Sequence, residues 1–344
     1  MKQIFSDVVE NNRLKERLGN DVLSARLPHA IILEGPRGSG KHTIARACAA
    51  ALSCERISDT NAPLPCGECI SCQKILKNIS PDVITVGREE RATIGVDSIR
   101  FLKEDVYVIP NDNEKKVYII EDADKMTDEA QNAFLLTLEE PPRYVHFFLL
   151  CESANALLET IRSRAPVLRT ESLTTDKIDE YICAHDRRAA QMKLTSSDDY
   201  KELLAASGEG IGKALEYLDP KAFAPVKQLR AIAYDFIRLA IRARGAQETL
   251  PLLSKFSTKR DVLDEQLATI KTAIRDLIAL KKDENAALLF YSDRETALET
   301  SDSISIMYLY DLYKTVETTR EEIRRNANVK LSLIKLALKS NILK

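Results

Sequence analysis

Glycine is scarce in this sequence, with 11 among 344 residues, about half of the usual ~7% share. The few glycines are also clustered. Gly35, Gly38 and Gly40 form one group, and a second group lies at residues 208–212. A chain that has few glycines and concentrates them uses them for backbone geometry in those stretches. The two clusters therefore predict specialised loops.

The sequence also lacks an excess of charge and any long apolar run. Its 50 Lys and Arg face 52 Asp and Glu, for a net charge of −2, which excludes a globally basic nucleic-acid binder but allows a local basic patch. No apolar run approaches the ~20 residues of a membrane span, and residues 1–7 do not resemble a signal peptide. We expect a cytoplasmic globular protein of two or three domains, with no membrane partner.

Short apolar runs alternate with helical patterns in the first half of the chain. The apolar runs are residues 30–33, 117–120 and 146–150. Helical patterns follow over residues 41–52 and 127–138, and Thr127 is of a type that caps helix N-termini. Continuous apolar strands that alternate with helices predict an α/β domain with a parallel sheet and helices on both faces. We assign residues 1–168 to this domain.

The strand signals end near residue 168, and helical patterns replace them. Residues 169–221 read as short helices, and Asp219-Pro220 with Pro225 predicts a linker. The stretch 222–344 is helical throughout, and its residues 323–343 form the last amphipathic segment. A further apolar stripe, at steps of four and three, is typical of an amphipathic helix; it consists of Leu263, Leu267, Ile270, Ile274 and Leu277.

Residues 35–42 read G-P-R-G-S-G-K-H, which fits the phosphate-loop pattern G-x-x-x-x-G-K. The stretch lies between a predicted strand and a predicted helix, which is the context that the motif requires. Backbone N–H groups of the loop and of the helix N-terminus would hold the phosphates of ATP or ADP, and Lys41 would reach the β- and γ-phosphates. The alternative is a glycine turn without a ligand.

Mg²⁺ would find an unusual set of side chains beside this loop. His42 offers an imidazole where Ser or Thr would offer a hydroxyl, and Mg²⁺ prefers oxygen. Thr43 comes one residue too late, about 100° around the helix. Glu121-Asp122 ends the second apolar run in an order opposite to the usual Asp-Glu, so the acid nearest an attacking water is one methylene shorter. We place all four in the candidate nucleotide site; for the acids, a solvated strand end is the alternative.

Seven cysteines and no secretory signal argue against a disulfide framework. Four of them are spaced C-x11-C-x2-C-x2-C, and they are Cys54, Cys66, Cys69 and Cys72. Four thiolates suit a tetrahedral Zn²⁺ and leave no position open for water, so the spacing predicts a structural zinc site. Zinc would hold an insertion too polar and proline-rich to fold alone. Free or transiently paired thiols are the alternative.

Together these residues resemble the bacterial clamp-loader branch of the AAA+ family, over essentially the whole chain. Besides the two sites, the motifs that carry the resemblance are residues 27–30, 132–135, 138–142, 160–164, 210–215 and 326–328. The resemblance implies a P-loop AAA+ domain, a small helical lid at 169–221 and a helical collar at 222–344. It also implies a hetero-pentameric ring of ATPase and other loader subunits that places a sliding clamp on primed DNA.

The resemblance further implies that this subunit does not turn over ATP. In the ATPase (motor) subunits of such loaders, residues that serve ATP hydrolysis align with Glu152, Gly212 and Leu136 of this chain. These three residues, like His42, are unsuited to hydrolysis. Arg164 aligns with an arginine finger that acts on ATP bound to a neighbouring subunit; a surface arginine that caps a helix is its alternative. The competing hypothesis is an active ATPase motor of the same loader, so enzyme activity of the chain itself stays open.

Overall fold

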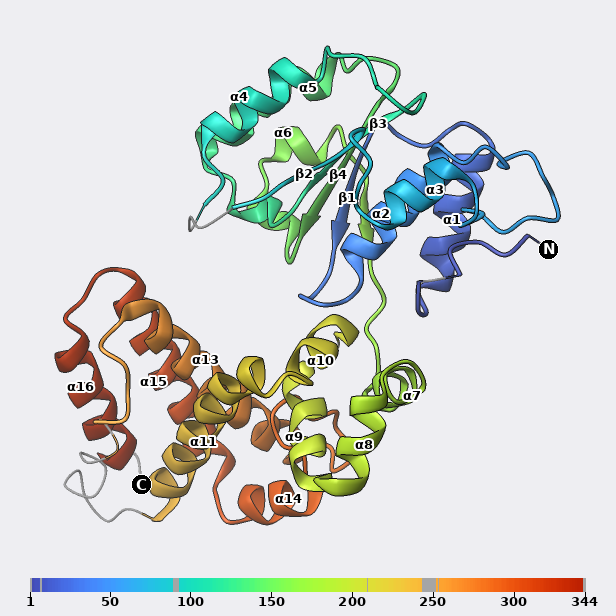
Figure 1. The fold of residues 1–344 in the computed structure, drawn as a ribbon. Coiled ribbons are helices and arrows are strands. Elements are labelled where there is room, and N and C mark those ends of the chain that lie inside the picture. Colours follow the sequence, from blue (N-terminus) through green and yellow to red (C-terminus); the bar gives the residue numbers. More distant parts are fainter. Residues whose placement is uncertain are drawn as a thin grey trace. The chain divides into compact units, whose positions relative to one another are not determined.

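The computed structural model falls into two compact units, Met1–Thr174 and Thr175–Lys344, which are described separately (Figure 1). It describes residues 2–6, 8–88, 93–208, 210–242, 252 and 254–342. Within these residues, no helix combines the length and the apolar character that crossing a membrane requires.

The first unit is built on a five-stranded sheet of order β2-β3-β4-β1-β5, in which all neighbouring strands are parallel. The strands are β1 (Ala30–Glu34), β2 (Val83–Val86), β3 (Lys116–Ile120), β4 (Val145–Cys151) and β5 (Val167–Arg169). Every residue of β3 and of β4 is buried. The parallel sheet predicted from the continuous apolar runs is therefore confirmed.

Helices cover both faces of this sheet (Figure 1). One layer comprises α1 (Asn12–Leu23), α2 (Lys41–Leu52) and α3 (Ile70–Leu76), and the other comprises α4 (Val96–Asp105), α5 (Asp128–Glu139) and α6 (Glu159–Arg162). Because side chains alternate along a strand, Ile31 and Leu33 enter the core beneath the first layer, whereas Ile32 enters the core beneath the second. The first unit is thus an α/β domain in which a parallel sheet lies between two layers of helices.

The carboxyl ends of the strands carry the residues that the sequence singles out. The phosphate-loop segment joins β1 to α2, and two short 3₁₀ helices, η1 (Ala123–Lys125) and η2 (Ala154–Ala156), follow β3 and β4. Thr127 caps α5 as predicted, because its Oγ1 accepts the N–H of Ala130 at 3.2 Å. In open parallel sheets, ligands bind at this edge.

The second unit is helical throughout its described part. Its helices are α7 (Thr175–His185), α8 (Arg187–Thr195), α9 (Ser197–Ser207), α10 (Ile211–Tyr217), α11 (Pro220–Arg242), α13 (Arg260–Leu280), α14 (Arg294–Asp302), α15 (Ile306–Arg324) and α16 (Val329–Ile342). The predicted apolar stripe lies on α13 and is fully buried between α11 and α15. Ion pairs Lys227–Asp199 and Arg230–Glu202 join α11 to α9. The predicted division into domains at residues 168 and 221 stays a prediction.

The linker predicted around Asp219-Pro220 is wrong, because this stretch begins a helix. Pro220 is the first residue of α11, where a missing N–H costs nothing and the fixed φ favours the helix. Pro225 lies inside the same helix, at the cost of one backbone hydrogen bond. Burial of neighbouring side chains, such as Phe223 with 3% exposure, stabilises the helix near Pro225.

The single amphipathic segment predicted over residues 323–343 is also interrupted. α15 ends at Arg324, and Asn326 adopts a left-handed backbone with φ of 64°, a conformation that asparagine tolerates after a helix. The side chain of Asn328 then accepts the N–H of Leu331 at 3.1 Å and starts α16. The last residue of the predicted segment, Leu343, lies outside the described residues.

Candidate functional site

The phosphate-loop glycines occupy positions that other residues would fill poorly. Gly38 and Gly40 both have φ of 85°, a left-handed backbone that favours glycine. At Gly35 a Cβ atom would lie 1.9 Å from Oγ1 of Thr170, so a larger residue would clash with Thr170 there. The three glycines bring the loop to the N-terminus of α2, where free N–H groups favour an anion.

Lys41 is the first residue of α2, and its ammonium group lies against the loop. Its Nζ donates to the carbonyl oxygens of Gly35 at 2.6 Å and Pro36 at 2.8 Å. Burial lowers the pKa of Lys41, and the negative charges of Glu152 and Asp124 oppose this shift. The predicted phosphate-binding lysine is therefore at the mouth of the loop.

His42 is half-buried and contacts the first acid after β3. Its Nε2 lies 2.8 Å from Oε1 of Glu121, and its Nδ1 lies 3.2 Å from Nη2 of Arg46. A guanidinium only donates, so Nδ1 accepts and the proton of the neutral ring sits on Nε2, facing Glu121. This hydrogen bond holds the pKa of Glu121 below its usual range. Thr43, in contrast, is exposed.

Asp122 is held by an arginine that the sequence analysis did not single out. Arg88 follows β2, and its Nε and Nη2 lie 2.8 Å and 2.7 Å from Oδ2 of Asp122. Asp122 itself has a left-handed backbone, with φ of 49°. The available signal was the β-branched run 83–86, which forms a strand whose carboxyl end meets that of β3.

These side chains do not fit Mg²⁺. Mg²⁺ demands a near-octahedral set of oxygen ligands, but Glu121 and Asp122 already accept hydrogen bonds from His42 and Arg88. No hydroxyl replaces the imidazole, because Thr43 is exposed to solvent. The predicted nucleotide ligands therefore divide into two groups: a loop with Lys41 that suits phosphates, and an acidic pair that does not suit the metal.

Glu152, Leu136 and Gly212, which replace residues that serve catalysis in motor subunits, lie in three different parts of the chain. Glu152 follows β4 and is exposed, and its backbone N–H donates to Asp124 at 3.4 Å. Leu136 is on α5 with an exposed fraction of 60%. Gly212 is in the first turn of α10 in the second unit. Of these three, Glu152 acts electrostatically on Lys41.

Arg164 lies at the surface, just after α6. Its Nη2 pairs with Oε1 of Glu139 at 2.7 Å, and its Nη1 donates to the carbonyl oxygen of Thr160 at 3.0 Å. Both partners of the ion pair are partly exposed, so the contact contributes at most about 1 kcal/mol. The guanidinium can therefore change partners at little cost.

The four cysteines of the predicted zinc site lie together. The sulfur atoms of Cys54, Cys66, Cys69 and Cys72 are all within 4.8 Å of one another, and those of Cys66 and Cys72 are 3.9 Å apart. Tetrahedral ligands at ~2.3 Å from Zn²⁺ would be separated by about that distance. Although burial alone would raise it, N–H groups of Cys69 and Glu68 lower the pKa of Cys66 to about 7, whereas burial raises the pKa of Cys54 and of Cys72. The donor set therefore fits Zn²⁺.

The cysteine insertion contacts both the phosphate-loop helix and the start of the chain. Cys72 Sγ lies 3.6 Å from the carbonyl oxygen of Ala50 on α2. Leu64 accepts the N–H of Phe5 at 2.7 Å and donates to Gln3 at 2.8 Å. The four thiols thus fix a loop on which residues 2–6 pack.

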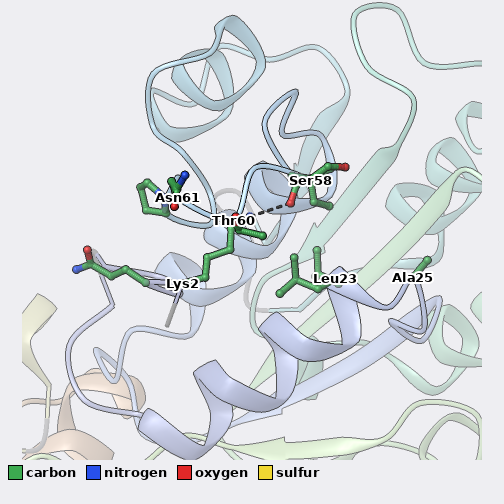
Figure 2. A pocket seen from close by; sticks show the side chains of 10 residues that line it. Lys2, Leu23, Ala25, Ser58, Thr60 and Asn61 are labelled. Carbon is green, nitrogen blue, oxygen red and sulfur yellow. Dashed lines mark hydrogen bonds between the residues drawn. The ribbon is translucent and has the colours of Figure 1, made fainter.

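A cavity of about 900 Å³ lies between this insertion, α1 and residues 2–6 (Figure 2). Lys2 borders it and donates to the carbonyl oxygens of Ile57 at 2.8 Å and Asp59 at 3.0 Å. The other lining side chains include Leu23, Ser58, Thr60 and Asn61. The cavity contains none of the residues that the sequence analysis singled out.

Comparison with known proteins agrees with this architecture. A family profile described as "DNA polymerase III, delta subunit" matches residues 10–174. DNA polymerase III subunit gamma of Buchnera aphidicola is 32% identical over 52% of this chain and 48% of its own length. DNA polymerase III subunit delta' of Haemophilus influenzae is 28% identical over 81% of this chain and 82% of its own length. The chain spans about half the length of the gamma relatives that it matches.

Among solved structures, a DNA polymerase III gamma subunit-related protein from Thermotoga maritima aligns with 95% of this chain and 98% of its own length, with 19% identity and a TM-score of 0.42. The family match and the named relatives, together with the P-loop sheet, confirm the resemblance to bacterial clamp loaders. Residues 10–174 therefore match a domain of DNA polymerase III subunits, and the chain is similar to subunits of that enzyme named gamma and delta'.

Proposed function

We propose that this chain is a delta-prime type subunit of a DNA polymerase III clamp loader. In a hetero-pentameric ring with delta and gamma or tau type subunits, it would help to place the sliding clamp on primed DNA in the cytoplasm. Extent of similarity supports this type: the delta' relative matches over 82% of its length, against 48% for the gamma relative. Contacts to DNA would be shared across the ring and directed to the backbone.

The contact between His42 and Glu121 carries the proposal that the chain does not hydrolyse ATP. Phosphoryl transfer depends on a metal ion that neutralises charge and on an acid that positions water. Here the acid next to the loop is bonded to an imidazole at 2.8 Å, and the second acid is paired with Arg88. Glu152 would add a negative charge where a γ-phosphate would lie.

Arg164 is the residue that we propose to act on a neighbour. A planar guanidinium beside a γ-phosphate stabilises the charge of the transition state. Arg164 is exposed, and its present partner, Glu139, is a surface carboxylate. In the ring, the guanidinium would exchange that carboxylate for the phosphate of ATP on the adjoining subunit.

An active motor subunit of the gamma or tau type is the second candidate. One observation favours it: the gamma and tau relatives are 32% to 34% identical over their shorter matches, compared with 28% for delta'. A motor would hydrolyse ATP by itself, whereas a delta-prime type subunit would only stimulate its neighbours.

Reconstitution of the ring with an active gamma type subunit tests the proposal. Arg164→Ala should lower the ATPase rate of the ring several-fold, since a finger is worth ~10³–10⁵ at the site that it serves. Arg162→Ala, two residues away on α6, is the matched control and should leave the rate near wild type. If Arg164→Ala and the control behave alike, Arg164 is not a finger.

A further inference from the structure

Both acids at the carboxyl end of β3 are already occupied by nitrogen donors. Oε1 of Glu121 lies 2.8 Å from Nε2 of His42, and its Oε2 faces Gly87, where an added Cβ would lie 3.4 Å away. Oδ2 of Asp122 takes both Nε and Nη2 of Arg88, at 2.8 Å and 2.7 Å. A metal ion at Oε1 of Glu121 or at Oδ2 of Asp122 would therefore have to displace these donors.

Two guanidinium groups, those of Arg88 and Arg46, take part in these contacts. Arg88 pairs with Asp122 directly, whereas Arg46 acts through the neutral ring of His42, with Nη2 3.2 Å from Nδ1. A guanidinium stays charged at any ordinary pH. The two arginines therefore place two positive charges beside two carboxylates, which is the charge that one Mg²⁺ would supply.

A divalent cation would have to break this arrangement in order to bind. It would strip the hydrogen bonds from Glu121 and Asp122 and leave two guanidinium groups next to a new positive charge. Arg46 has no replacement at hand, since its Nε is already buried without a hydrogen-bond partner. Leaving a buried charged group unpaired is expensive, so the metal is disfavoured even though the phosphate loop is intact.

We infer that the phosphate loop binds a nucleoside diphosphate or triphosphate without a divalent cation. Arg88 and the pair Arg46–His42 supply, beside Asp122 and Glu121, the positive charge that the metal ion would otherwise supply. The phosphates meet the loop N–H groups, the N-terminus of α2 and Lys41. The inference rests on the proposed function in one respect, that the loop is no longer used for hydrolysis.

Calorimetric titration of the full chain with ADP tests the inference. We expect the same dissociation constant in excess Mg²⁺ and in excess EDTA, within about a factor of two, or roughly 0.4 kcal/mol. Lys41→Ala should abolish the heat of binding in both buffers. A tenfold weaker binding in EDTA, or no binding of ADP in either buffer, would overturn the inference.

A double variant tests which side chains replace the metal. His42→Thr with Arg88→Gln restores a hydroxyl and frees both acids, so ADP should then bind at least tenfold more tightly with Mg²⁺ than with EDTA. Arg100→Gln, an exposed arginine on α4 that pairs with Asp97, is the control and should stay independent of the metal. A double variant that keeps its circular dichroism spectrum and binds ADP equally in both buffers would refute the assignment of these residues.

The outcomes separate this inference from the proposed function. If ADP fails to bind but the chain also fails to hydrolyse ATP, the inference falls and the proposed function stands. If the wild-type chain hydrolyses ATP with Mg²⁺, both fall together.

Discussion

His146, on β4, shows how burial decides the charge of a single side chain. Its Nδ1 lies 3.2 Å from the carbonyl oxygen of Pro28, and burial lowers its pKa to about 4 from an ordinary 6.5. As the pH falls below 6.5, the unfolded chain takes up the proton first. The contribution of neutral His146 to stability is therefore complete above pH 6.5 and is lost as the pH falls toward 4.

Replacement of His146 should flatten the acid side of the stability curve. At pH 5 protonation of His146 in the unfolded chain lowers the stability of the wild type by about 2 kcal/mol relative to pH 7, and His146→Gln should lose that much less between the two pH values. Urea unfolding of the full chain at both pH values measures the difference. His185→Gln, an exposed histidine of α7, serves as the control. Equal losses in wild type and His146→Gln would show that His146 does not titrate on unfolding.

Sequence reasoning found His42 but not the arginines that act with it. The motif itself marks His42, because the usual residue there is known, and Glu121-Asp122 is visible at the end of an apolar run. Arg88 pairs with an acid 34 positions away. The position of Arg88 beside Asp122 depends on the register of β2 against β3, and the sequence of a four-residue strand does not predict its register. The pair of Arg88 and Asp122 forms through the tertiary fold and leaves no local spacing. Arg46, in contrast, lies four residues after His42 on the same helix, a spacing at which side chains meet.

Among the elements of the first unit, the cysteine insertion is the one that we expect to depend on bound zinc. Its contacts run from Cys72 to α2 and from Leu64 to residues 2–6, and the insertion is a loop of turns between α2 and α3. Because structural zinc contributes directly to folding, the insertion and the first residues of the chain should loosen together when zinc is lost.

Metal analysis should find one zinc per wild-type chain and none in Cys69→Ser. The variant should also unfold at a lower temperature, and amide exchange should increase in residues 2–6 and 54–72. Cys183→Ser, which lies on α7 outside the cluster, should retain zinc and wild-type exchange. Full zinc content in Cys69→Ser would remove the four-cysteine site.

The start of α5 offers a second test at this scale. Thr127 accepts the N–H of Ala130 at 3.2 Å, so Thr127→Ala should lower the free energy of unfolding by about 1 kcal/mol. Asn132→Ala, exposed on the same helix, should be neutral or slightly stabilising, since alanine is the best helix former. Chemical denaturation measures both. A loss no larger than that of the control would show that the cap contributes nothing.

Elements were predictable where the pattern was long. The runs that became β1, β3 and β4 are uninterrupted and apolar, and the stripe on α13 repeats over residues 263–277, whereas β2 contains Thr85 and the three-residue β5 contains Arg169. Pro220 and Pro225 suggested a linker, but Pro220 begins α11, where proline is favoured. Pro225 lies in the interior of α11, where proline usually breaks a helix. Tertiary packing of α11 decided the outcome there.

At the scale of the whole molecule, the two units have separate cores. The sheet of the first unit lies between two apolar clusters, and the helices of the second unit enclose a third. A unit with its own core could in principle fold alone. This agrees with a family domain that ends at residue 174, where the first unit ends.

A fragment of residues 1–174 should therefore fold by itself and keep its zinc. We expect a cooperative thermal transition and the circular dichroism of a mixed α/β protein. A fragment without a cooperative transition would show that the first unit needs the second for its stability.

The steady-state ATPase rate of the isolated chain, with Mg²⁺ and primed DNA, tests the central claim most directly. The contacts of His42 with Glu121 and of Arg88 with Asp122 predict no turnover above the rate of a Lys41→Ala control. Turnover of about 1 s⁻¹ or more, an ordinary enzymatic rate, would contradict the account and identify the chain as a motor.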